Sequence, residues 1–188
     1  MKKEVNQLLS ILLRYLVLII AGFPSLWIFY LIFTPLTIYP VYFLIKLFHS
    51  ATLITNFIII DNYLPIEIIN PCIAGSAYYL LLILNLSTPG LKFLKRLGLI
   101  FVSFFALLLV NILRIFLLSL LFVSGFSLFD ITHELFWYFG SIVFVIGIWF
   151  LGVKMFKVRE IPFYSDFLLL AKSKLRKKLK KPKRSKKH

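Results

Sequence analysis

Long apolar runs separated by short polar stretches dominate the first 153 residues of the chain. A helix that crosses a bilayer needs about 20 apolar residues. Four stretches meet or approach this length: 8–33, 74–90, 98–123 and 135–153. The pattern predicts an all-α polytopic membrane protein with about four transmembrane helices. Pro24 predicts a bend in the first of them, because a proline inside a helix removes a backbone hydrogen bond.

The stretch 36–58 is also apolar, but Pro40 and several polar residues interrupt it. A further crossing here would separate the N-terminal lysines from the basic loop at 91–97 and the basic C-terminal segment. Cytoplasmic segments next to membrane helices are rich in Lys and Arg, so that arrangement is disfavoured. We therefore expect 40–56 to form an interfacial helix that lies on, or dips into, the outer face of the membrane.

β-branched residues flank Asp61-Asn62-Tyr63 within 57–70, and this pattern predicts a small β-hairpin. The edges of a hairpin carry unpaired backbone groups, which cannot face hydrocarbon. The hairpin is therefore expected on the extracytoplasmic side or packed on protein.

Basic residues are concentrated on one predicted side of the membrane. The net charge is +15, and fourteen of the 22 Lys and Arg residues lie in 154–188. Four crossings place 19 of the 22 in the cytoplasm, together with both termini. We predict a single membrane-embedded domain over 1–160 and a cytoplasmic polybasic, amphipathic tail over 161–188.

The tail is expected to bind anionic lipid headgroups in the cell membrane. Its terminal charges are not interleaved with the aromatic residues that stacking on nucleic acid requires, so no nucleic-acid partner is predicted.

The composition of the chain excludes several kinds of binding and catalytic site. Hydrophobic residues make up 61% of the chain and charged residues 15%, and the mean hydropathy is +0.94. One cysteine excludes an intrachain disulfide, and the three histidines show no metal-ligand spacing. Phosphate-binding glycine loops and zinc-protease motifs are absent from the sequence. No cofactor and no metal are therefore predicted.

The single cysteine lies in the segment NPCIAGSAYY, residues 70–79. Asn70 suits a helix N-cap and Pro71 suits the first helical position. This places Cys72 in the first turn of the helix predicted over 74–90, where the helix dipole favours a nucleophilic thiolate. The next residues are small and leave room for a substrate chain or a neighbouring helix: Ala74, Gly75 and Ser76. The competing interpretation is that Cys72 is a small buried hydrophobe.

Arg114 lies deep in the predicted helix 98–123, where an unpaired guanidinium is costly. It lies ~15 Å from the outer end of that helix, at 1.5 Å per residue. Asn111 is three residues earlier and projects from the same helical face. A buried arginine of this kind indicates a functional site, or a structural residue satisfied by carbonyls and Asn111.

His133 lies at the outer entrance of the last predicted crossing, and histidine is a side chain suited to proton transfer. Asp130, one helical turn away, is positioned to orient the imidazole ring. Alternatively, Ser127 and Asp130 form a capping box, and His133 is a polar residue at the membrane surface.

Cys72, Arg114 and His133 come from three consecutive predicted crossings and all fall in the outer half of the membrane. They supply a nucleophile, a proton carrier and a cation for a developing oxyanion. Acyl transfer through a thioester requires these three parts.

The order and placement of Cys72, Asn111-Ile-Leu-Arg114 and His133 resembles the exosortase/archaeosortase family of membrane cysteine transpeptidases, in a small, pacearchaeosortase-like archaeal branch. The resemblance covers about residues 40–153. It implies an enzyme that cuts a secreted protein near a C-terminal tag made of a motif, a transmembrane helix and a basic cluster. The protein is held as a thioester and passed to an acceptor, which is a membrane phospholipid in archaeal relatives.

Carried over to this chain, the resemblance makes Cys72 the nucleophile and His133 the general base and acid. Arg114 would stabilise the oxyanion or activate the thiol, and Asn111 would position Arg114. Cys-Ile-Ala-Gly stands where many members have Cys-Ser-Gly or Cys-Thr-Gly, which bears on substrate preference. Some archaeal members have a second arginine in place of the histidine.

Two other classes of function remain open from the sequence. One is a non-catalytic membrane assembly or lipid-binding protein, in which Arg114 grips an anionic headgroup. The other is a small transporter, which the lack of an internal repeat disfavours.

Overall fold

Three long helical segments form the body of the protein, in a computed structural model that describes residues 2–88 and 91–156. They are α2 (Trp27–Lys46), α5 (Phe93–Val123) and the segment Phe129–Met155, and each is long and apolar enough to cross a membrane. The structure is therefore mostly helical, and the apolar composition and length of these three segments are those of membrane helices. The predicted tail, 161–188, lies outside the described residues.

The first predicted crossing, 8–33, is not one bent helix. The chain forms two helices, α1 (Lys2–Gly22) and α2, separated by a turn. Pro24 cannot donate a helical hydrogen bond, and the two residues after it adopt left-handed φ angles of 50° and 61°. α1 packs against a shorter helix, α4 (Gly75–Ser87), where the Tyr79 hydroxyl donates to the Leu18 carbonyl at 3.2 Å.

The predicted interfacial helix over 40–56 is wrong. Residues 40–46 continue α2, because Val41 and Ile45 are completely buried among the other helices. Pro35 and Pro40 lie inside α2, and prolines are tolerated in membrane helices whose neighbours compensate the lost backbone bonds. The remainder of the segment includes a strand, β1 (Ala51–Ile54), in which partly buried and exposed residues alternate.

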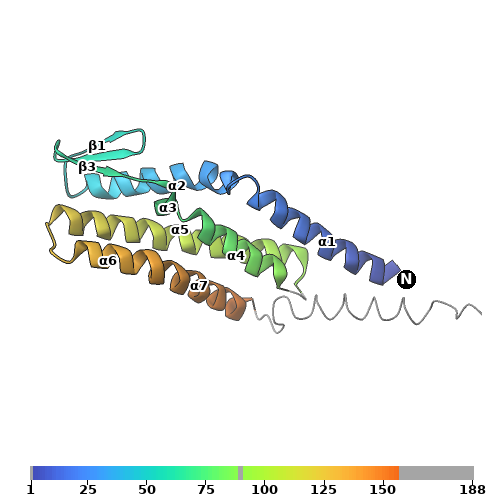
Figure 1. The fold of residues 1–188 in the computed structure, drawn as a ribbon. Helices are drawn as coiled ribbons and strands as arrows, with labels where there is room; N and C mark the ends of the chain where they lie inside the picture. Colours follow the sequence, from blue (N-terminus) through green and yellow to red (C-terminus); the bar gives the residue numbers. More distant parts are fainter. Residues whose placement is uncertain (1, 89–90, 157–188) are drawn as a thin grey trace, which may run out of the picture.

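A three-stranded antiparallel sheet covers one end of the bundle (Figure 1). Its strands follow one another in space as in sequence: β1, β2 (Phe57–Ile60) and β3 (Leu64–Glu67). The predicted hairpin is present as β2 and β3, and its turn falls at the predicted residues. Asp61 and Asn62 adopt left-handed φ angles of 50° and 66°, which Asp and Asn tolerate in tight hairpin turns. Ile58 and Ile60 are buried and anchor the sheet on the core.

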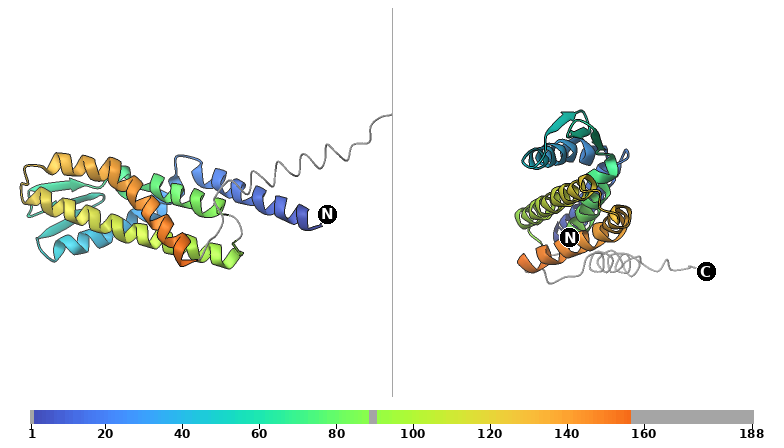
Figure 2. Two further views of the ribbon diagram at one scale, coloured as in Figure 1. Left: turned by 90° about the horizontal axis from the view of Figure 1, so that it is seen from below. Right: turned by 90° about the vertical axis from the view of Figure 1, so that its left-hand side faces the viewer.

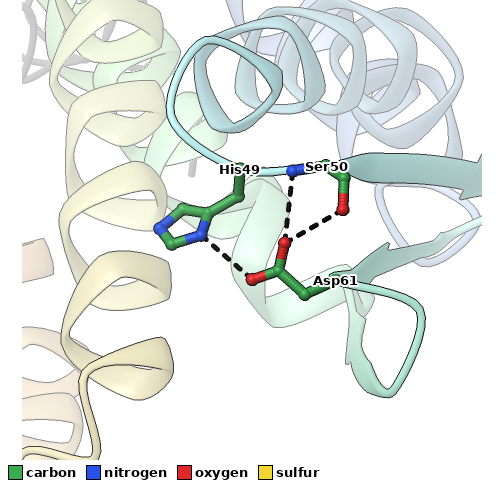
Figure 3. Close-up of polar contacts among 3 residues, drawn as sticks. All are labelled: His49, Ser50 and Asp61. Carbon is green, nitrogen blue, oxygen red and sulfur yellow. Dashed lines mark hydrogen bonds and ion pairs between the residues drawn. The ribbon is translucent and has the colours of Figure 1, made fainter.

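Asp61 ties the sheet to the end of α2 (Figure 3). Its Oδ1 accepts hydrogen bonds from the Ser50 backbone N–H at 3.2 Å and from the Ser50 hydroxyl at 3.0 Å. Its Oδ2 lies 3.1 Å from His49 Nδ1. The hydrogen bond from the Ser50 hydroxyl, together with His49, holds the pKa of Asp61 below its ordinary value of 3.8. The ionised carboxylate is therefore the form that fixes this junction.

The substitution Asp61→Ala is expected to loosen the junction between α2 and β1, and acid is expected to do the same to the wild type. A group whose pKa is lowered by folding stabilises the structure above its ordinary pKa, and that contribution is lost as pH falls through the lowered value. Hydrogen–deuterium exchange at the Ser50 amide, corrected for intrinsic rates, measures both effects. Tyr63→Phe, in the same exposed turn, is the control. Unchanged Ser50 exchange in Asp61→Ala would show that the contact does not hold the junction.

α4 lies at the centre of the bundle and contacts α1, α2, α5 and α7 (Ser141–Met155). Tyr78 on α4 is fully buried, stacks on Phe33 of α2 and meets Phe104 of α5 edge-on. The helix ends at Ser87, so it is shorter than the predicted 74–90. Its 13 residues span ~20 Å, less than the ~30 Å hydrocarbon thickness, so α4 alone is too short to cross.

The connections between the helices fall into two groups, one at each end of the bundle. The start of α1, the connection from α4 to α5 and the end of α7 share one end (Figures 1 and 2). The sheet and the turn from α5 to α6 (Phe129–Leu135) share the other, here called the sheet end. α1 extends beyond the bundle at the first end (Figure 1). The arrangement keeps the N-terminal lysines on the same end as Lys92 and Lys95.

Candidate active site

Cys72 lies in a one-turn helix, α3 (Asn70–Ile73), and not in the first turn of a long helix. Ala74 adopts a left-handed φ of 60° and separates α3 from α4. Asn70 is the first residue of α3 and its exposed side chain makes no capping hydrogen bond; the N-cap position is Ile69. The prediction that Asn70 caps the cysteine helix is therefore wrong.

The surroundings of Cys72 do not produce a more acidic thiol. α3 lies outside the three membrane-spanning helices. Burial raises the pKa of the Cys72 thiol, whereas a hydrogen bond from the Ile69 backbone to the thiol and the positive charge of Arg114 act in the opposite direction. The helix-dipole argument made from the sequence fails because α3 has four residues and ends at Ala74.

Asn111 of α5 holds the cysteine backbone in place. Its Nδ2 donates a hydrogen bond of 2.8 Å to the Cys72 carbonyl oxygen. Asn111 is buried, so this bond fixes the height of α3 against α5. The sequence predicted that Asn111 positions Arg114, whereas the contact observed is with Cys72.

Arg114 is partly buried one turn further along α5. Its Nη1 donates to the Ser141 hydroxyl of α7 at 3.3 Å. Its Nε is buried and has no hydrogen-bond partner among the described residues. Burying a guanidinium with an unpaired N–H costs free energy of folding. An apolar side chain could fill the same space without that cost.

Aromatic rings, not Asp130, orient His133. The imidazole stacks on Phe129, with centroids 5.7 Å apart, and meets Trp137 edge-on at 5.8 Å. Asp130 is exposed, and the part of the chain that the structure describes contains no hydrogen bond between it and His133. Leu128 is the N-cap of α6 and no side chain caps the helix, so the alternative capping box is also not formed.

Cys72, Arg114 and His133 line one pocket. The pocket lies between α3, α5 and the α6 segment and is small, with a free volume of about 30 Å³. Its lining residues are Pro71, Cys72, Arg114, Leu118, His133, Phe136 and Trp137. Three polar groups therefore converge within an otherwise apolar wall, the composition typical of small ligand sites.

The pocket is recessed below the sheet end of the bundle. Asn111, which holds Cys72, is 12 residues from the end of α5 at Val123, a distance of ~18 Å along the helix. Arg114 is nine residues from that end, or ~14 Å, close to the depth expected from the sequence.

A π-helix, η1 (Phe136–Gly140), forms one side of the pocket. Such bulges are rare and occur frequently at functional sites. Phe136 and Trp137 of η1 line the pocket, and Ser141 follows it directly and contacts Arg114. The sequence analysis missed these residues and Leu118. Ser141 could have been found as a polar residue in an apolar helix at the depth of Arg114.

The small residues after Cys72 do not line the pocket. Ala74 and Gly75 are buried, and a Cβ added to Gly75 would lie 2.8 Å from the Tyr30 ring of α2. The sequence predicted that these small residues leave room for a substrate chain or for a neighbouring helix. At Gly75 that room is taken by the neighbouring helix α2. Ser76 is exposed.

Within residues 2–88 and 91–156, no group of three or more His, Cys, Asp or Glu side chains is placed to hold a metal ion. Comparisons with known proteins match no family model, no curated protein and no solved structure. The structure thus combines three helices long and apolar enough to cross a membrane with a pocket lined by Cys72, Arg114 and His133.

Proposed function

We propose that the protein is a membrane cysteine transpeptidase of the exosortase/archaeosortase type. The observation that carries the proposal is the single pocket lined by Cys72, Arg114 and His133. These side chains come from α3, α5 and α6, so the fold gathers residues that are far apart in the sequence. A nucleophile, a proton carrier and a fixed cation in one apolar recess are the parts of an acyl-transfer site.

In the proposed first step, Cys72 attacks the carbonyl carbon of a peptide bond. An ordinary thiol is mostly protonated at neutral pH, and burial of Cys72 increases that tendency, so a base must accept its proton. His133 is that base. As the Sγ–C bond forms, the carbonyl oxygen becomes an oxyanion that the Arg114 guanidinium stabilises.

The intermediate then collapses and the peptide C–N bond breaks. His133 returns its proton to the leaving amine, and the protein remains attached to Cys72 as a thioester. The hydroxyl or amine of an acceptor attacks the thioester and gives its proton to His133, and the thiol is regenerated. Atoms and charges balance without a cofactor.

The apolar wall favours transfer to the acceptor over hydrolysis. Leu118, Phe136 and Trp137 limit the access of water to the thioester. The α5 residues that line the pocket, Leu118 and Arg114, lie ~8 and ~14 Å from the end of that helix, a depth that suits an acceptor that resides in the membrane, such as a phospholipid.

The proposed orientation places the sheet end outside the cell and the opposite end in the cytoplasm. Lys2, Lys3, Lys92 and Lys95 support it, because cytoplasmic segments are enriched in basic residues. The proposed substrate is a secreted protein with a C-terminal motif, a transmembrane helix and a basic cluster, which has the same orientation. The basic segment 161–188 would contact anionic lipids on the cytoplasmic face.

A co-expression assay tests the proposal. A secreted protein carrying such a tag is expected to lose the tag when this chain is present and to keep it when the chain is absent, as measured by intact mass. Binding of lipid headgroups that depends on Arg114, with no tag removal, would instead support the non-catalytic membrane protein.

A further inference from the structure

The sheet has one open edge that leads directly to Cys72. β3 pairs with β2 alone, so its other side is an edge of the sheet. Four residues lie between Glu67, the last residue of β3, and Cys72. Ile69, between them, remains extended with φ −89° and ψ 166°. The strand path therefore continues almost to the pocket.

The register identifies which backbone groups face outward. The Ile68 N–H donates to the Asn56 carbonyl at 2.9 Å, which makes these two residues a hydrogen-bonded pair. Hydrogen-bonded pairs alternate in an antiparallel ladder, so Ile66 and Leu64 also face β2. Glu67 and Pro65, between them, direct their backbone groups to the open edge.

Pro65 limits how far this edge can be used. It has no N–H, and a proline is tolerated in a strand where that group would face outward. The complete donor and acceptor pair on the outward side of β3 therefore belongs to Glu67, the strand residue nearest Cys72. Unpaired strand edges of this kind bind extended peptides by main-chain hydrogen bonds.

We propose that the substrate binds as an added strand on the open edge of β3, with its backbone paired to Glu67 a few residues from the bond that Cys72 attacks. The ligand is an extended peptide, and recognition at this edge is by backbone and not by side chain. This inference rests on the proposed acyl-transfer function of Cys72. The exposed residues Ile69, Asn70 and Pro71 then guide the chain from the edge into the pocket mouth.

β1, the opposite edge of the sheet, does not offer the same route. It packs against α2, and its chain continues into β2 and not toward the pocket. A second copy of this chain is the alternative occupant of the β3 edge.

Alkylation of Cys72 in the detergent-solubilised full-length chain tests the inference. The probes are methyl vinyl sulfone and an acetyl-tetraalanyl vinyl sulfone, whose double bond accepts Sγ at one carbon and the thiol proton at the other. The peptidyl probe is expected to react about tenfold faster or more, because two main-chain hydrogen bonds hold it at the edge. Mass spectrometry gives both rates.

Two changes should remove this advantage. N-methylation of the alanine amides blocks strand pairing without altering the protein. Glu67→Pro removes the outward N–H, whereas the matched control Glu67→Thr keeps it and removes the same carboxylate. We expect the peptidyl advantage to be lost with the N-methylated probe and in Glu67→Pro, and retained in Glu67→Thr.

A peptidyl probe that is no faster than methyl vinyl sulfone would overturn the inference, as would an advantage insensitive to N-methylation. A dimer that dissociates in Glu67→Pro, with probe rates unchanged, would assign the edge to a second copy and overturn it too. These rates do not depend on tag removal. A further outcome separates this inference from the proposed function. If the rate advantage of the peptidyl probe depends on its backbone amides, but tag removal survives Cys72→Ala, then peptide binding at the β3 edge is supported and the transpeptidase is rejected.

Discussion

Replacement of Cys72 by alanine is expected to abolish tag removal, with a loss of about 10³-fold or more. Alanine has no nucleophile, and in the proposed mechanism Cys72 alone holds the acyl group. The fold should persist, because the Asn111 hydrogen bond is made to the Cys72 backbone and not to its thiol. Intact-mass analysis of a co-expressed tagged protein measures the loss.

Ser76→Ala is the matched control for Cys72→Ala. Ser76 is a small residue four positions later, is exposed, and does not line the pocket. This variant should remove the tag at the wild-type rate. Tag removal that survives Cys72→Ala in cells would reject Cys72 as the nucleophile, whatever the geometry of the pocket.

Arg114→Met is expected to lower tag removal by about 10²–10³-fold while leaving thermal stability unchanged or higher. The loss follows from removing the cation that faces the developing oxyanion. Stability should not fall, because the guanidinium has a buried, unpaired Nε and one long hydrogen bond to Ser141. An unbranched apolar side chain of similar length fills the space without that cost. Thermal unfolding in detergent and the rate of tag removal are measured on the same preparation.

The effects of Arg114→Met on tag removal and on thermal stability together distinguish a catalytic arginine from a structural one. A structural role predicts that Arg114→Met unfolds at lower temperature and loses activity in proportion to the folded protein that remains. Ser141→Ala is the control, since it removes the arginine's partner and keeps the charge. It should reduce activity less than Arg114→Met does.

Apolar runs located two of the three long apolar helical segments, α5 and Phe129–Met155, but could not separate a continuous helix from a broken one. Residues 98–123 lie within α5, whereas the run at 8–33 is divided between α1 and α2. Segments rich in Ile and Leu are compatible with either helix or strand, so β1 was interpreted as part of an interfacial helix. Partly buried and exposed residues alternate along β1, and this pattern can be interpreted only when the strand is seen packed against α2.

The turn at Asp61 was predictable because its residues favour left-handed backbone conformations. The break at Ala74 was not, because alanine has no such preference and tertiary contacts impose the conformation. That break determines the chemistry of Cys72, since it removes the long helix whose dipole was expected to act on the thiol.

The three site residues were predicted from their type and depth, and the structure brings them to one pocket. Their partners were not predictable. Asn111 and Arg114 share a helical face, but each side chain bonds to a different element, α3 in one case and α7 in the other. Sequence spacing gives the direction of a side chain along its own helix, whereas its partner depends on how the helices pack.

The most direct test of the account is to trap the covalent intermediate. The chain and a tagged secreted protein are co-expressed and the complex is isolated under acidic denaturing conditions, which preserve thioesters. Mass spectrometry is expected to find the shortened substrate attached to Cys72, and neutral hydroxylamine is expected to release it as a hydroxamate. Tag removal without any hydroxylamine-sensitive adduct on Cys72, under conditions that preserve a thioester standard, would contradict acyl transfer through this residue.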